Sequence, residues 1–333
     1  MKVARPLCAS SAALLAGLVA FSPAIQSQPG NPDLARSLKL ATWNLEWLIA
    51  PADFKALKQG CAPRESHVGG AERRLPCDVA HRLERSTRDL KALARYARQL
   101  DGDVIALQEV DGPEAARLVF PGYEFCFTSR PHLQNNGFAI RAGLRHRCGR
   151  DLRALSLGDR LRRGAELILF PGEPRELQLL NVHLKSGCTR DLLNGPTKAC
   201  AELARQIPAL EAWIDDRARA GGRFAVLGDF NRDLLHDLGA ARTSTGQRLR
   251  LWPELDDGDP PEADLTNAAE GARFLNCAPG QGYGAYIDFI VLSHSLGARR
   301  VPGSFERITY SPLDVRRTRL SDHCPVAINI ASD

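Results

Sequence analysis

The sequence lacks a long apolar run, a close cysteine pair and a large excess of charge. A membrane-spanning helix needs roughly 20 apolar residues, and no segment reaches that length. The absence of a Cys-x-x-Cys pair argues against a zinc site. Lys and Arg number 44 against 39 Asp and Glu, a balance too mild to indicate a nucleic-acid partner by itself. With 44% hydrophobic and 25% charged residues, the composition is that of a globular protein.

The first 24 residues have the pattern of a secretory signal peptide. Lys2 and Arg5 precede an apolar run over 12–21, and the small-residue stretch 22–24 follows it. This order predicts a cleaved signal and a mature chain in the periplasm or outside the cell, without stable membrane insertion.

The rest of the chain is expected to hold one domain. Residues 25–36, rich in Gln, Pro and Asn, are predicted to be a flexible leader, and 37–331 a single catalytic domain, because no repeat or second linker interrupts them. Without Lys2 and Arg5, the formal charge falls from +5 to +3.

Removal of Cys8 with the signal leaves an even set of cysteines, which suggests disulfides in an exported protein. They are Cys61, Cys77, Cys126, Cys148, Cys188, Cys200, Cys277 and Cys324. Eight cysteines allow about 105 pairings, so the sequence does not fix the connectivity. Proximity favours Cys61 with Cys77 and Cys188 with Cys200, and buried free thiols are the alternative.

Hydrophobic spacing indicates an α/β (α+β) protein. Apolar residues at helical spacing predict helices over 80–100 and 199–220, where Pro208 would kink the second helix or mark a late start. Residues 50–80 lack periodicity and are expected to be a stapled loop. Apolar runs predict strands at 38–43, 104–107, 137–141, 165–170, 177–184, 223–228, 286–292 and 325–330. An irregular insertion is expected over 233–280.

Polar residues stand where the predicted strands end. They are Asn44, Glu46, Glu109, His183, Asp229, Asn231, Asp288, Asp322 and His323. Any one of them would be most simply a turn or cap residue. Together they would bring carboxylates into one pocket, where two of them about 4 Å apart repel each other by several kcal/mol. Oxygen ligands without thiolate favour Mg²⁺, Mn²⁺ or Ca²⁺, whose shells water and phosphate complete.

Six short segments in this order resemble motifs of the endonuclease/exonuclease/phosphatase superfamily, which includes deoxyribonuclease I. They are Thr42-Trp43-Asn44-Leu45-Glu46, Leu107-Gln108-Glu109, 181–187 (NVHLKSG), Gly228-Asp229-Phe230-Asn231, Ile287-Asp288-Phe289-Ile290 and Ser321-Asp322-His323-Cys324-Pro325. The resemblance runs from about 38 to 330. It implies a deoxyribonuclease I-like, four-layer sandwich of two packed mixed β-sheets flanked by helices, with the site at one edge of the sheets.

The resemblance also implies metal ligands. Glu109 would be the principal ligand, Asn44 would bind the metal or the phosphate, and Asp322 would lie near the metal. Glu46 occupies a position that some members fill with an acid. The cofactor is expected to be Mg²⁺ or Mn²⁺, with Ca²⁺ as an alternative.

The catalytic residues follow in the same way. His323 and Asp288 would form a hydrogen-bonded pair that takes or gives a proton. Asp229 would orient or deprotonate the attacking water, while Asn231 and His183 would donate hydrogen bonds to phosphoryl oxygens.

Lys185 follows His183 by two residues, so it is expected on the same strand face as a phosphate contact. Basic stretches over 141–150, 160–163 and 316–319 favour a nuclease, with DNA or RNA as substrate. Few aromatics (6%) argue against a sphingomyelinase. The stretch Tyr286-Ile287-Asp288-Phe289 lacks the cysteine- and arginine-containing motif of inositol polyphosphate phosphatases.

The predicted function is therefore an exported, metal-dependent phosphodiesterase, most simply an endonuclease. A phosphatase or phosphodiesterase acting on a small-molecule or lipid phosphoester is the alternative, and a non-catalytic binding module is a third reading. The chain is expected to be a monomer without a protein partner.

Overall fold

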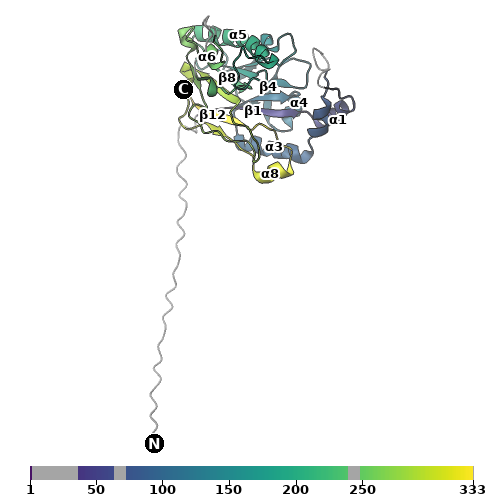
Figure 1. The fold of residues 1–333 in the computed structure, drawn as a ribbon. Helices are drawn as coiled ribbons and strands as arrows, with labels where there is room; N and C mark the ends of the chain where they lie inside the picture. The colour runs from purple at the N-terminus through teal and green to yellow at the C-terminus, as the bar shows by residue number, and fades with distance from the viewer. Residues whose placement is uncertain (2–36, 64–72, 239–247, 333) are drawn as a thin grey trace.

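Two six-stranded β-sheets form the centre of the computed structural model (Figure 1). The model describes Met1 and residues 37–63, 73–238 and 248–332. The predicted leader and, apart from Met1, the predicted signal peptide lie outside the described residues. No helix in the described part of the chain has the length and apolar character needed to cross a membrane.

The first sheet has the strand order β11-β12-β1-β2-β4-β3. Its strands are β1 (Ser37–Leu48), β2 (Val104–Val110), β3 (Tyr123–Phe127), β4 (Asn135–Arg141), β11 (Glu306–Arg307) and β12 (Val326–Ala331). The second sheet has the order β5-β6-β7-β8-β10-β9. Its strands are β5 (His146–Cys148), β6 (Ala165–Leu169), β7 (Leu177–His183), β8 (Arg223–Asp229), β9 (Leu265–Asn267) and β10 (Asp288–Ser293). Both sheets are mixed, since β1 and β2 run parallel, as do β7 and β8, while other neighbours are antiparallel.

The described residues form eight helices, of which the two longest cover the outer faces of the two sheets. They are α1 (Pro51–Gln59), α2 (Cys77–Arg82), α3 (Thr87–Leu100), α4 (Pro113–Arg117), α5 (Lys198–Arg219), α6 (Trp252–Leu255), α7 (His294–Gly297) and α8 (Pro312–Arg317), with short 3-10 turns at Arg153–Ser156, His236–Leu238 and Pro261–Ala263. Figure 1 shows α3 and α8 on one side of the sheets and α5 and α6 on the other.

Three apolar layers hold the sandwich together. Leu40 and Ile328 of the first sheet pack with Leu179 and Leu227 of the second in the layer between the sheets. A second layer joins α3 to the first sheet, and a third joins α5 to the second. Each fully buried leucine stabilises the fold by roughly 1.5–3 kcal/mol. The predicted four-layer architecture is confirmed.

The helices differ from the sequence predictions at their ends. Residues 50–80 were expected to be a loop, but they include α1 and most of α2, which are too short to show periodicity. The helix expected over 80–100 is split, because α3 starts at Thr87, where Ser86 and Asp89 form a capping box. Pro208 lies inside α5, which already begins at Lys198, so it marks no late start.

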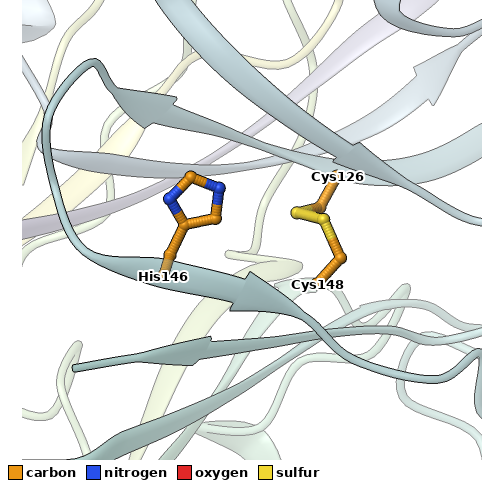
Figure 2. Close-up of side chains that lie close together, drawn as sticks. All are labelled: Cys126, His146 and Cys148. Atoms are coloured by element: carbon orange, nitrogen blue, oxygen red, sulfur yellow. A yellow bond between two sulfur atoms is a disulfide. The ribbon is translucent and has the colours of Figure 1, made fainter. Parts of the chain in front are cut away.

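Four disulfides cross-link the described chain. Cys61–Cys77 and Cys188–Cys200 are paired as predicted. Cys126–Cys148 joins β3 to β5, the edge strands of the two sheets, with His146 beside the bond (Figure 2). Cys277–Cys324 ties the segment before β10 to the residue that follows His323.

Candidate active site

The register of the second sheet aligns three predicted site residues. His183 at the end of β7 pairs with Asp229 at the end of β8, and Asp229 pairs with Asp288 at the start of β10. Gly228 permits this alignment, because a Cβ there would lie 2.0 Å from the Val182 carbonyl oxygen and the backbone φ is +144°. The glycine in GDFN is therefore required for the close approach of β7 and β8.

Local irregularities in the first sheet present two more acids. The pairing of β1 with β2 shifts register after Asn44, and the pairing of β2 with β4 shifts after Leu107. Glu46 and Glu109 lie in these shifts with left-handed backbones, at φ +45° and +58°. Non-glycine residues rarely adopt this conformation, and it often marks functional sites.

A polar contact joins the two sheets beneath the site. Gln108 donates a hydrogen bond to Asn181 Oδ1 at 2.7 Å, and Asn181 donates in turn to the carbonyls of Leu107 and Gly137. All four groups are buried, so each bond is made in a low-dielectric interior. This contact fixes the position of one sheet's strand ends relative to those of the other.

His323 and Asp288 form the predicted pair. The imidazole Nδ1 lies 2.9 Å from Asp288 Oδ2, while Nε2 lies 3.8 Å from Asp229 Oδ2. Ser321 holds the His323 backbone, because its hydroxyl accepts the His323 N–H at 3.0 Å and donates to the Asn44 carbonyl at 2.7 Å. The Tyr310 hydroxyl donates to the His323 carbonyl.

Asn44 connects the acids of the two sheets. Its amide nitrogen donates to Asp229 Oδ2 at 3.0 Å and lies 3.4 Å from Glu109 Oε1, and its amide oxygen accepts the Glu46 N–H. His183 Nε2 also lies between the two acids, 3.4 Å from Asp229 and 3.8 Å from Glu109. Glu109, Asp229 and His323 thus belong to one cluster.

The remaining acids complete this cluster. Glu46 accepts the backbone N–H of Asp322 at 3.2 Å, and Asp322 Oδ1 lies 4.0 Å from His323 Nε2. The structure therefore brings together all the predicted catalytic and metal-binding residues, while their roles stay predictions.

The pKa values of the cluster reflect burial and crowding. Burial, together with the charge of Asp322, raises the pKa of Glu46 to about 7, and burial together with Asp288 raises that of Asp229 to about 7. Burial opposes the charged form of His323, but the carboxylates of Asp288 and Asp229 raise its pKa well above the usual value. Burial and nearby Arg162 lower the pKa of His183 well below 6.5, so this imidazole is neutral.

The donor set fits a divalent, oxygen-seeking cation. Glu109 and Asp322 lie close enough to Glu46 that their charges raise its pKa, and none of the three is a thiolate. A cation among them would relieve this repulsion, and carboxylates with an open side for water and phosphate suit Mg²⁺ or Mn²⁺.

A cavity of about 300 Å³ opens beside the His323–Asp288 pair. Asn231, Asp322 and Arg307 line it, together with Tyr283, whose side chain is exposed at the rim. Asn231 has a left-handed backbone (φ +51°), and its amide nitrogen donates to the Leu184 carbonyl at 3.1 Å. The cavity therefore offers space for a substrate next to the imidazole of His323 and to the acids Asp288 and Asp322.

Lys185 is the predicted site residue that lies least clearly in the cluster. Its ammonium donates to the Ser186 carbonyl at 2.7 Å. Burial lowers the pKa of Lys185, the charge of Glu202 in α5 opposes this shift, and Lys198 of α5 adds to it. The strand β7 ends at His183, so strict alternation does not extend to Lys185. Its contact with phosphate stays a prediction.

Two arginines outside the predicted site residues support the cluster. Arg85, buried before α3, donates to the carbonyls of Glu46 and Leu320, and its Nη2 lies 3.6 Å from Glu46 Oε2. Arg162 donates to the Leu184 carbonyl at 2.7 Å. Burial lowers the pKa of its guanidinium, and the charges of Glu109 and Asp229 oppose that shift. Arg162 belongs to the basic stretch 160–163, which was the only sequence signal for either residue.

Solved structures share this fold at low sequence identity. A 3'-5' exonuclease (NExo) from Neisseria meningitidis aligns with 89% of this chain and 100% of its own, at 16% identity and a TM-score of 0.52. The AP endonuclease LMAP from Leishmania major aligns over 90% and 89%, at 18% identity and 0.52. D. rerio TDP2, complexed with a single strand DNA product, aligns over 89% and 99%, at 15% identity and 0.54.

Among curated proteins, none matches the chain. The model of the Endonuclease/Exonuclease/phosphatase family matches residues 41–323, which include every predicted catalytic and metal-binding residue. The chain therefore belongs to the endonuclease/exonuclease/phosphatase family, a family of hydrolases that act on phosphoester bonds.

Proposed function

We propose that the protein is an exported, divalent-metal-dependent nuclease that hydrolyses phosphodiester bonds of DNA or RNA. The observation that carries this proposal is the convergence of the His323–Asp288 pair, Asp229 and the acids Glu46, Glu109 and Asp322 in one cluster. A cavity opens on this cluster at His323, Asp288 and Asp322. A buried set of acids next to a charged imidazole suits attack of water on an anionic phosphoester.

The chain's own residues supply the proton transfers. Asp229 accepts a proton from the attacking water, since a carboxyl with a pKa of about 7 is matched to this task near neutral pH. The backbone N–H of Asn231 donates to Asp229 Oδ1 at 2.8 Å, which leaves Oδ2 on the side of the imidazole.

His323 enters the reaction protonated, because its pKa is raised well above the usual value. Asp288 accepts the Nδ1–H and fixes the ring, so Nε2–H can be donated to an oxygen of the reacting phosphate. His183 and Asn231 donate further hydrogen bonds to phosphoryl oxygens, where negative charge develops.

Glu109, Glu46 and Asp322 would hold the divalent cation, with Asn44 orienting the carboxylates of Glu109 and Asp229. When bound, this cation neutralises charge on the phosphate and on the leaving oxygen.

Support for a nucleic-acid substrate comes from the solved structures that share this fold. The three solved structures above are named as an exonuclease, an AP endonuclease and a protein with bound DNA product. Support for export comes from the predicted signal at residues 1–24 and from four disulfides, which persist in oxidising compartments.

The test is hydrolysis by the purified mature chain. We expect cleavage of plasmid DNA or of RNA with Mg²⁺ or Mn²⁺, and none with a chelator. The same preparation is offered sphingomyelin and bis-p-nitrophenyl phosphate. Cleavage of only the small diester or the lipid would replace the nuclease assignment with the small-phosphoester alternative. Binding of DNA without any cleavage would indicate a binding module.

A further inference from the structure

A groove of about 460 Å³ lies between α3 and α8, and the basic side chains that line it outnumber the acidic ones. Arg88, Lys91 and Arg95 face it from α3, and Arg317 faces it from α8. Asp314, the acid in this groove, is paired with Arg95 at 2.7 Å. Among the described residues, Arg88, Lys91 and Arg317 have no ion-pair partner, and all three are exposed.

The walls of this groove are held rigidly together. Asp314 of α8 accepts a hydrogen bond from the Tyr96 hydroxyl of α3 at 2.8 Å, and Tyr96 accepts the Ser311 N–H at 2.8 Å. Figure 1 shows the two helices side by side at one end of the molecule. The cations are therefore carried on a preformed surface rather than on a loop that could spread them apart.

The groove is continuous in the chain with the catalytic cluster. Thr318, which lines it, stands four residues before Asp322. The Arg319 N–H is bonded to Asp89 in the first turn of α3 at 2.7 Å, and buried Arg85 links Leu320 to Glu46. Asp322 lines the cavity, so the short segment 318–322 connects the groove to the cavity.

Resting on the proposed nuclease function, we propose that the α3–α8 groove is an exosite for the sugar–phosphate backbone of the nucleic-acid substrate. Arg88 and Lys91 lie three residues apart on α3, a span of about 5 Å at 1.5 Å per residue, and Arg317 lines the same groove from α8. Duplex DNA carries one negative charge per roughly 1.7 Å of helix axis, so several phosphates fall within this span. The exosite raises affinity without contact to bases, so it binds all sequences alike.

The test removes the three unpaired cations together. In Arg88→Gln/Lys91→Gln/Arg317→Gln, each lost phosphate contact is expected to lower the slope of log affinity against log salt by about 0.9 in magnitude. At 0.1 M salt this corresponds to roughly tenfold weaker binding per contact. Hydrolysis of bis-p-nitrophenyl phosphate, which is too small to reach the groove, is expected to be unchanged.

A matched control removes the same charge elsewhere. Lys55→Gln/Arg117→Gln/Arg205→Gln takes three exposed cations from α1, α4 and α5, none of which lines the groove. Binding of a fluorescent 20-base-pair duplex is measured by anisotropy on the His323→Ala background, across a series of salt concentrations. Cleavage is measured separately on the His323 proteins.

The outcomes separate the exosite from the function. Loss of affinity and slope in the groove variant alone supports the exosite. If wild type cleaves nucleic acid but the groove and control variants bind alike, the exosite is overturned and the nuclease assignment stands. If the duplex binds through the groove but is not cleaved, the exosite stands and the nuclease assignment falls.

Discussion

The site has two halves, one on each sheet, and their carboxylates are balanced in different ways. On the second sheet, Asp229 and Asp288 face the imidazole of His323, which supplies a positive charge from within the chain. On the first sheet, Glu46 lies among Glu109 and Asp322, and Arg85 opposes their repulsion only in part, since the pKa of Glu46 still rises to about 7. The first half therefore carries negative charge that a bound cation would offset, whereas in the second half His323 supplies the opposite charge.

The backbone differs between the halves in the same sense. His183, Asp229 and Asp288 stand in regular register, where pairing alone makes them neighbours. Glu46 and Glu109 reach the site through register shifts with left-handed backbones. One half is built by ordinary strand pairing and serves proton transfer, while the other uses strained backbone and serves metal binding in our proposal.

The largest expected effect comes from removal of the internal charge. His323→Ala should lower turnover of DNA and of bis-p-nitrophenyl phosphate by about 10²–10⁴-fold, since general acid–base catalysis contributes this much. Circular dichroism should show an unchanged fold. His294→Ala is the control, because this exposed histidine pairs with Asp264 away from the cluster. A near-normal rate for His323→Ala would refute its role.

The half of the site on the first sheet should make the stability of the fold depend on pH when a chelator removes divalent cations. The pKa of Glu46 is raised from 4.5 to about 7, so the folded protein is more stable with Glu46 protonated than with Glu46 ionised. This contribution is fully present below pH 4.5 and is lost as the pH rises through 7, on the order of 3 kcal/mol. Thermal unfolding from pH 4.5 to 8 should show the decline, and Mg²⁺ should reduce it.

Glu46→Gln should flatten that decline, while Glu270→Gln, at an exposed position, should not. A decline of the same size in Glu46→Gln and wild type would assign it to other groups.

The two halves of the site should differ in their effect on the affinity for Mg²⁺, and this difference is expected to be smaller than the effects above. Glu109→Gln is expected to raise the Mg²⁺ concentration for half-maximal activity by roughly 10–100-fold. Asp288→Asn should lower the rate but leave this Mg²⁺ concentration unchanged. Titration calorimetry with Mg²⁺ checks both, and an equal shift in the two variants would contradict the division into two halves.

The sequence predicted the second half better than the first. Apolar runs that end in His183 and Asp229 are visible without structure, and the parallel pairing of β7 with β8 makes these two residues neighbours. The left-handed turns at Glu46 and Glu109 depend on register shifts between strands, which no local pattern in those segments reports.

Long-range supports escaped prediction for a related reason. Arg85 is 235 residues from Leu320 and Tyr310 is 13 from His323, and each supports the site through a backbone carbonyl. Carbonyl acceptors are present at every residue, so the sequence carries no sign of which one an arginine or tyrosine will find. The short helices α1 and α2 were missed because fewer than three turns show little periodicity.

The Cys277–Cys324 bond adds a condition on when the catalytic histidine is in place. Cys324 follows His323 directly, and Arg307 donates to both sulfurs, at 3.1 and 3.0 Å. Inside a reducing cytoplasm this tether would be missing, so a chain still at its site of synthesis would hold His323 loosely. For the exported nuclease that we propose, the missing tether would limit cleavage of DNA inside the cell that makes it. We expect Cys277→Ser/Cys324→Ser to nick plasmid several-fold more slowly than Cys61→Ser/Cys77→Ser. Equal rates would show that the Cys277–Cys324 bond does not position His323.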